Sequence, residues 1–267
     1  MGGVLPLHTV MLGDGALPPV LFVHGFPISH EMWRPAAERL AARWRCILPD
    51  LPGYGRTPAR AECGIGSYAD DLAGLLDAMD ERRRVTLVGL SMGGIIALEF
   101  FRRHRSRIGA MVLCDTRYNA ETAEGVVQRE RVARMALDHG TRAVAETMID
   151  RALAPNADVA VRARLMGLMC ATPPEGVAAG SRALAGRADS FPTLREIDVP
   201  TLLIWGREDQ ITGLDIAEVM HREIRGSRLE IIEGAGHVPP MERAEEFARV
   251  VGEWMRSHEA NAPCRGA

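Results

Sequence analysis

Short apolar segments alternate with longer amphipathic segments along most of this 267-residue chain, and no other feature limits its fold as strongly. Most of the short segments are apolar throughout, as strands are when a parallel sheet is buried on both faces. Such strands alternating with helices indicate an α/β fold in which helices cover both faces of a parallel sheet. The expected strands are 20–23, 46–48, 85–88, 111–114, 201–205 and 229–232, and the expected helices are 31–43, 68–79, 91–104, 214–224 and 242–257.

The alternation stops between residues 119 and 194, where the sequence contains no convincing strand. Several helical segments rich in Ala, Arg and Met are separated there by Pro155 and Pro173-Pro174. The stretch is longer than one crossover connection needs. We therefore predict a helical cap at 119–194, inserted after the strand that ends at Cys114, and a core domain formed by 1–118 and 195–267. The alternative is a longer series of ordinary crossover helices.

Composition excludes several classes of function. All 32 basic residues are arginines, so chemistry that needs a lysine ammonium group, such as Schiff bases, Ser-Lys dyads and P-loops, is ruled out. A net charge of −3 leaves no basic surface for nucleic acid or an anionic membrane. We see neither a signal peptide nor an apolar run long enough to span a membrane. The expectation is a soluble, cytoplasmic protein with no nucleic-acid or membrane partner.

A glycine-rich segment joins the expected strand 85–88 to the helix that follows it. It reads Gly89-Leu90-Ser91-Met92-Gly93-Gly94. G-x-S-x-G between a strand and a helix is typical of a nucleophile elbow, a strained turn that exposes a serine hydroxyl at the carboxyl edge of the sheet. The helix N-terminus beneath the turn favours developing negative charge. We predict that Ser91 is a nucleophile.

A nucleophilic serine in acyl transfer also needs backbone N–H donors for the oxyanion, held in place before the reaction. The segment that directly follows strand 20–23 is His24-Gly25-Phe26-Pro27. We assign the two donors to the N–H groups of Phe26 and Met92. His24 itself has two interpretations, a catalytic base and a strand-end histidine that fixes its loop by hydrogen bonds, and we favour the second.

The serine needs a base, and His237 is the best placed of the eight histidines. Strand 229–232 is followed by Gly234-Ala235-Gly236-His237, whose glycines permit a tight loop that brings the imidazole over the sheet edge. His30, close to the expected oxyanion loop, is the remaining competitor.

The base in turn needs an orienting carboxylate. Asp209 follows strand 201–205 and is our prediction, with Glu208 and Asp115 as rivals. Asp115 follows the neighbouring strand, from which a carboxylate is also able to reach His237. The chain order Ser91, Asp209, His237 is the one expected for a nucleophile elbow of this kind.

These segments together resemble the α/β-hydrolase superfamily over nearly the whole chain. The matching segments, in family order, are 24–33, 50–56, 89–94, 199–201 and 234–237. The resemblance implies a mostly parallel eight-stranded sheet, a cap inserted after its sixth strand, and a Ser-His-Asp mechanism with no metal and no cofactor. Segments 113–117, 171–176 and 187–190 more narrowly resemble small bacterial carboxylesterases and 3-oxoadipate enol-lactonase-like hydrolases.

The chain departs from the family pattern in two places that bear on the fold and the site. Only 23 residues precede His24, so we expect the usual first hairpin to be short or partly missing. The loop Pro52-Gly53-Tyr54-Gly55 has Tyr54 where many relatives carry a different residue. Tyr54 is either a residue of the pocket rim or a structural residue of its loop.

A serine at position 91 favours acyl chemistry, because relatives that attack carbon do so with a carboxylate. We therefore expect hydrolysis of carboxylic esters with small to medium acyl groups through an acyl-enzyme. A lactonase with the same triad is the first alternative. The further alternatives are a C–C bond hydrolase, a cofactor-free perhydrolase, a non-catalytic ligand-binding protein and an interaction module built on the cap.

The sequence constrains the substrate pocket less than it constrains the fold. The substrate-binding residues that we expect are Phe26, Met92, Met148, Met166, Met169 and Val238. The cap residues Met148, Leu153, Leu165, Met166 and Met169 either form a soft apolar wall over the acyl group or pack within the cap. The cap arginines are mostly solvated helix faces, with recognition of an acidic substrate as the alternative. The expected partner is a small-molecule ester or lactone, and a homodimer is left open.

Overall fold

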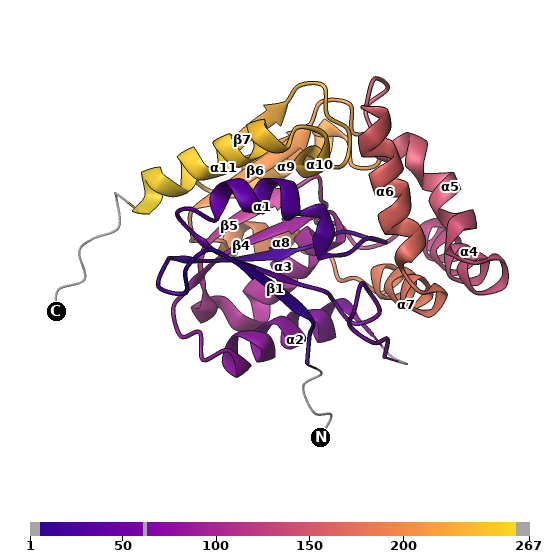
Figure 1. Ribbon diagram of the computed structural model, residues 1–267, viewed down its shortest axis with the longest axis horizontal. Coiled ribbons are helices and arrows are strands. Elements are labelled where there is room, and N and C mark those ends of the chain that lie inside the picture. Colours follow the sequence, from indigo (N-terminus) through magenta and orange to yellow (C-terminus); the bar gives the residue numbers. More distant parts are fainter. Residues whose placement is uncertain (1–5, 61–62, 260–267) are drawn as a thin grey trace.

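The computed structural model describes residues 6–60 and 63–259, and a single seven-stranded sheet lies at the centre of these residues (Figure 1). The strand order is β1-β3-β2-β4-β5-β6-β7, with β1 antiparallel to β3 and all other neighbours parallel. The strands are β1 (Thr9–Leu12), β2 (Pro19–Val23), β3 (Arg45–Pro49), β4 (Val85–Leu90), β5 (Ile108–Cys114), β6 (Thr201–Gly206) and β7 (Arg228–Ile232).

Helices cover both faces of the sheet, because successive side chains of each strand point to opposite faces and both sets are apolar. In β2, Val20 and Phe22 pack into the apolar cluster formed with α1 and α11, whereas Leu21 and Val23 pack into the cluster formed with α2 and α3. These core helices are α1 (Arg34–Leu40), α2 (Ile65–Ala78), α3 (Met92–His104), α8 (Phe191–Glu196), α9 (Leu214–Glu223), α10 (Pro239–Glu242) and α11 (Ala244–Glu259).

The six strands expected from the apolar runs are all confirmed, and the α/β-hydrolase fold with them. The helix boundaries differ locally. The expected helix 31–43 consists of a 3₁₀ turn, His30–Met32, followed by α1, in which Pro35 occupies the first turn and has no N–H to continue the preceding turn. The next helix, α2, begins earlier than expected, at Ile65, where the Ser67 hydroxyl bonds both the N–H and the carbonyl of Gly64.

The expectation of eight strands is wrong for the described residues, which contain seven. Residues 6–23 are taken up by β1, a turn and β2, so this part of the chain supplies one strand ahead of β2. That strand pairs with β3 at the edge of the sheet and is only partly buried. The helical segment after Cys114 consequently follows the fifth strand, β5, where the family pattern implied the sixth.

Four helices lie together beyond one end of the sheet (Figure 1). We call α4 (Ala123–His139), α5 (Thr141–Ala152), α6 (Val159–Ala171) and α7 (Pro174–Ala185) the cap helices. Helix α4 packs against α7 and α5, and α5 packs against α6. The described residues between 119 and 194 contain no strand, as the sequence predicted. The division into a core of 1–118 and 195–267 and a cap of 119–194 stays a prediction.

The cap helices are attached to the core by specific hydrogen bonds. The Thr172 hydroxyl donates to the carbonyl of Pro27 at 2.8 Å, and Arg164 donates to the carbonyl of Glu31 at 3.0 Å. The N–H of His237 donates to the carbonyl of Ala152 at 3.0 Å, at the end of α5. These bonds hold the cap helices against the carboxyl edge of the sheet.

Among the described residues, none of the helices combines the length and the apolar character that a membrane span requires.

A close approach between the backbone of α7 and that of the core yields a stability prediction. A Cβ atom added at Gly176 would lie 1.8 Å from the carbonyl oxygen of Gly53, so the backbones must separate. We expect Gly176→Ala to lower the free energy of unfolding by about 1–3 kcal/mol, as overpacking does. In Gly167→Ala, the matched control on α6, the new methyl meets nothing within 4 Å. That variant should be stabilised by about 0.5–1 kcal/mol.

Urea unfolding of the two variants and the wild type checks this expectation. Equal effects of the two substitutions would show that Gly176 and Gly53 are not in close contact in solution.

Candidate active site

Ser91 lies on a strained turn between β4 and α3. Its backbone has φ 54° and ψ −113°, a conformation that residues other than glycine rarely adopt. The turn is crowded, since a Cβ at Gly89 would lie 2.4 Å from the carbonyl oxygen of Gly93, and one at Gly93 would lie 2.1 Å from that of Val23. A side chain at Gly94 would collide with Thr116. The glycines of the motif are therefore required by close packing around the turn.

The strain is held by hydrogen bonds to the neighbouring strand. The N–H of Ser91 donates to the carbonyl of Cys114 at 2.9 Å, and the Thr116 hydroxyl donates to the carbonyl of Ser91 at 2.6 Å. Both partners belong to the end of β5 and the residues just after it. Hydrogen bonds at both the N–H and the carbonyl of Ser91 thus fix its backbone at the carboxyl edge of the sheet.

A continuous chain of hydrogen bonds joins Ser91, His237 and Asp209. The Ser91 Oγ lies 2.8 Å from His237 Nε2, and His237 Nδ1 lies 2.9 Å from Asp209 Oδ2. The side chain of His237 is 7% exposed and that of Asp209 is 1% exposed. In this geometry Nδ1 donates to the carboxylate, which leaves Nε2 free to accept the proton of the serine hydroxyl.

The Asp209 carboxylate is held in its ionised form by its surroundings. Burial alone would raise its pKa, but the adjacent His237 and the hydrogen bonds that Asp209 accepts keep the pKa below its usual value. One oxygen accepts from the N–H groups of Ile211 at 2.7 Å and Thr212 at 3.1 Å. The other accepts from the Thr212 hydroxyl and from His237. These hydrogen bonds orient the carboxylate and also favour its ionised form.

The rival residues occupy different positions. His30 Nδ1 bonds Asp50 at 2.7 Å, away from the serine. Asp115 is buried beside Asp209 and accepts from the N–H of Gly206 at 2.8 Å. Burial and the neighbouring charge of Asp209 raise the pKa of Asp115 well above its usual value. Glu208 makes no hydrogen bond to His237 among the described residues, so the geometry brings Asp209 to the histidine.

His24 fixes its loop, as the favoured interpretation of the sequence expected. Its Nε2 accepts from the N–H of Leu51 at 3.1 Å, and its Nδ1 donates to the carbonyl of Gly25 at 2.9 Å. The loop carries Phe26 to the cavity beside Ser91. The N–H groups of Phe26 and Met92 find no acceptor among the described residues, which leaves both available to an oxyanion.

A small cavity of about 50 Å³ lies beside Ser91 and His237. Of the substrate-binding residues expected from the sequence, Phe26 and Met148 line it. The other lining residues are Ile95, Thr116, Arg117, Arg129, Leu184, Ile211 and Thr212. A methionine at position 148 leaves part of this wall adaptable, because its side chain has three rotatable bonds.

The other expected substrate-binding residues do not line this cavity. Met169 and Val238 are buried in the apolar cluster on the α1 and α11 face, together with Leu153 and Leu165, and Met166 packs against the same cluster. Met92 is buried in the opposite cluster. Tyr54 is fully buried too, with its hydroxyl 3.8 Å from the sulfur of Met92. Their roles in substrate binding stay predictions.

Sequence reasoning missed Glu242, which ties the histidine loop to the cap helices. Its Oε1 accepts from the N–H of Gly236 at 2.8 Å, and its Oε2 accepts from the N–H of Ala154 at 2.8 Å. The available signal was an acidic residue in the short helix that follows His237. The arginines of the cavity, Arg117 and Arg129, were also not singled out, because nothing in the sequence separates them from the other arginines.

Two groups of described residues have ligand atoms close enough together to hold a metal ion. They are His8, His30 and Asp50, and Asp115, Asp209 and His237. In the first group the two carboxylate oxygens of Asp50 accept from both imidazoles and from the N–H groups of His30 and Arg56. In the second, His237 bonds Asp209 through Nδ1 and Ser91 through Nε2, while Oδ2 of Asp115 is buried with no hydrogen-bond partner among the described residues.

Comparison with known proteins supports this description of the fold. Residues 18–244 match the family model of the alpha/beta hydrolase fold. A pimeloyl-[acyl-carrier protein] methyl ester esterase of Neisseria meningitidis is 30% identical, over 90% of this chain and 93% of that protein.

Two solved structures are similar over nearly the whole chain. A thermophilic esterase from Thermogutta terrifontis, with malate bound, has a TM-score of 0.91 and 36% identity, covering 94% of this chain and 93% of that one. The enol-lactonase from Burkholderia xenovorans has a TM-score of 0.86 and 28% identity, covering 94% and 96%.

The chain belongs to the α/β-hydrolase fold family. Within that family it resembles small bacterial esterases and enol-lactonases, as the narrower sequence resemblance implied.

His24 yields a prediction about acid stability. Its bond from Leu51 requires an unprotonated Nε2, and burial lowers the pKa of His24 to about 4, from about 6.5 in an unfolded chain. A pKa lowered by folding adds stability that is fully present above the unfolded value and lost as pH falls through the folded value. We expect roughly 3 kcal/mol of unfolding free energy to be lost through His24 between pH 6.5 and 4.

Urea unfolding of the wild type and His24→Gln at several pH values measures this loss. The variant should be less stable at pH 7, where it lacks the two hydrogen bonds, and should lose less stability on acidification. Parallel pH profiles for the two proteins would assign the acid sensitivity to other groups.

Proposed function

We propose that this protein is a serine hydrolase that cleaves carboxylic esters of small to medium acyl groups through an acyl-enzyme. The observation that carries the proposal is the unbroken line of hydrogen bonds from Asp209 through His237 to Ser91, on a serine held in a strained elbow. The similarity to the two named esterases supports ester hydrolysis as the reaction.

The geometry fits each step of acyl transfer. His237 Nε2 accepts the proton of Ser91 as Oγ attacks the ester carbonyl, and Asp209 stabilises the imidazolium that forms. The oxyanion of the tetrahedral intermediate accepts from the N–H groups of Phe26 and Met92. His237 then gives its proton to the leaving alkoxide, and the acyl group stays on Ser91. Water activated by His237 attacks the acyl-enzyme, releases the acid and restores the serine.

Lactone hydrolysis is the second candidate, favoured by the similarity to the enol-lactonase of Burkholderia xenovorans. A lactonase needs the same nucleophile, base and oxyanion donors. It differs in that the leaving alkoxide stays tethered to the acyl group, so that opening the ring yields a single hydroxy-acid product. Comparing butyrolactone-type substrates with open-chain esters on the same enzyme decides between the two.

Replacement of Ser91 tests the nucleophile. With a p-nitrophenyl ester series from acetate to octanoate, we expect Ser91→Ala to reduce kcat by a factor on the order of 10⁴ or more, because the nucleophile is lost. Asp209→Asn should reduce kcat by about 10³–10⁴, since the amide stabilises the wrong tautomer of His237. Unfolding curves of both variants show whether the fold is retained.

The acyl-enzyme is tested by mass spectrometry of acid-quenched reactions. The wild type should gain the mass of one acyl group on the peptide that contains Ser91, and Ser91→Ala should gain none. Turnover by Ser91→Ala near the wild-type level, or acylation of another residue, would contradict the proposed mechanism.

A further inference from the structure

Three arginines gather beside the cavity that contains Ser91. Arg117 and Arg129 line the cavity, and Arg187 lies behind them with a side chain that is 1% exposed. The only carboxylate that these guanidinium groups bond directly is Glu121, among the described residues. Because arginine stays protonated in proteins, the cluster carries three positive charges against one negative charge.

Arg187 and Glu121 use their bonding capacity within the protein. Arg187 donates to Glu121 at 2.6 Å and also to the carbonyls of Asn119, Leu184 and Ala120. Glu121 accepts from Arg187 and Arg129, and these two arginines keep its pKa at about 2 even though burial alone would raise it. This pair therefore fixes the start of the cap segment to the end of α7. Arg117 feels the charges of Glu121 and Asp209 from a distance but bonds no carboxylate among the described residues.

Arg117 and Arg129 keep free donors. Arg129 donates from Nε to Glu121 at 3.1 Å, and none of the described residues accepts from its two terminal nitrogens. Arg117 donates from Nη2 to the carbonyl of Ile211 at 2.6 Å, and its Nε and Nη1 likewise have no acceptor in the described part of the chain. Both arginines thus have unused N–H groups at the wall of the cavity.

This arrangement is costly in a protein without an anionic ligand. Burial lowers the pKa of Arg117 and of Arg129, and the charge of Arg187 lowers both further. The positive charges therefore lie close together in a poorly solvated place, where an unpaired charge is unfavourable. A carboxylate accepts from two guanidinium N–H groups at once and offsets the excess charge.

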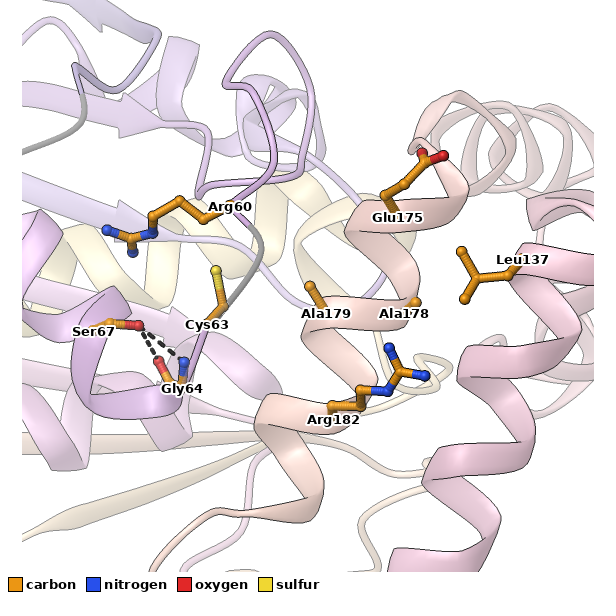
Figure 2. Close-up of a pocket in the computed structure, with 9 residues that line it drawn as sticks. All are labelled: Arg60, Cys63, Gly64, Ser67, Leu137, Glu175, Ala178, Ala179 and Arg182. Atoms are coloured by element: carbon orange, nitrogen blue, oxygen red, sulfur yellow. Dashed lines mark hydrogen bonds between the residues drawn. The ribbon is translucent and has the colours of Figure 1, made fainter.

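A second groove contains arginines that are paired with carboxylates of the protein. It has a volume of about 740 Å³ and lies between the residues before α2 and the helices α4 and α7 (Figure 2). Figure 2 shows Arg60 and Arg182 on its opposite sides. Arg60 bonds Asp71 with two nitrogens, and Arg182 bonds Glu130 with two nitrogens. These arginines have carboxylate partners in the protein, so this larger groove does not need an anion.

We propose that the substrate carries a carboxylate in addition to its scissile ester or lactone bond, and that Arg117 and Arg129 bind this carboxylate. The inference rests on the proposed function for the scissile bond and adds the substrate class. Apolar side chains that line the same cavity, among them Phe26, Ile95 and Leu184, suit the short methylene chain between the two polar ends.

Matched esters test the preference on both sides of the scissile bond. On the acyl side, monomethyl succinate, glutarate and adipate are compared with methyl butyrate, valerate and hexanoate, in which a methyl group replaces the carboxylate. On the alcohol side, 4-acetoxybutyrate is compared with butyl acetate in the same way. We expect kcat/KM to be higher for the acidic member of at least one pair.

The variant that tests the binding residue is Arg129→Gln, because Glu121 keeps its bond from Arg187 when Arg129 is lost. The ratio of kcat/KM between the acidic and the neutral ester should fall roughly 10- to 100-fold, the usual effect of removing a donor from a charged group. Arg131→Gln is the matched control, since Arg131 lies on the same helix, is exposed, and should leave the ratio as in the wild type. Arg117→Gln provides an independent second variant.

Binding separates this inference from the proposed function. Calorimetry with glutarate and adipate on Ser91→Ala should show binding that weakens roughly 10- to 100-fold when Arg129→Gln is added. If no ester is hydrolysed but this binding is found, the carboxylate site stands and the proposed reaction fails. If esters are hydrolysed with no acidic preference in any pair, and Arg129→Gln changes acidic and neutral substrates alike, the carboxylate site is wrong and the esterase stands.

Discussion

The strained turn at Ser91 is the constraint on which the rest of this structure depends. A positive φ at a serine persists only where the surroundings hold it, and here they do so through the glycines at 89, 93 and 94 and the bonds from β5. The turn packs directly on the end of β2, as the approach of Gly93 to Val23 shows. Because β2 and β4 are parallel neighbours, the loop that carries Phe26 and the turn that carries Ser91 emerge at the same edge of the sheet.

The same parallel order explains why residues predicted from separate parts of the sequence lie together. Each of Ser91, Asp209 and His237 follows an apolar strand within a few residues, and parallel strands bring their carboxyl ends together. Five of the six expected strands are largely buried on both faces and mostly apolar, and β7, at the sheet edge, was recognisable from its apolar residues around Glu230. Strand β1 was not recognised; it has four residues at the opposite edge and is only partly buried. The number of strands was therefore inferred from the resemblance, which implied one too many.

The pocket could not be predicted in the same way. Met148 and Met169 are both methionines on cap helices, yet one lines the cavity and the other is buried in the core. The difference arises from how the helices pack on each other and on the loops of the core. Arg129 is likewise one of three arginines on α4. Only the three-dimensional arrangement shows that Glu121 is shared and that the terminal nitrogens of Arg129 have no partner.

The attachment of the cap helices differs between the part that holds the histidine loop and the part that lines the far side of the cavity. The histidine loop is bonded to the end of α5 and the residues just after it, through His237 to Ala152 and through Glu242 to Ala154. This link is tight, because a Cβ at Gly236 would lie 2.6 Å from the nitrogen of Ala154. Arg129 on α4 and Leu184 on α7 wall the cavity from helices that do not bond this loop. Substitutions on α4 and α7 therefore change the shape of the cavity without touching the bonds that hold the histidine loop beside Ser91.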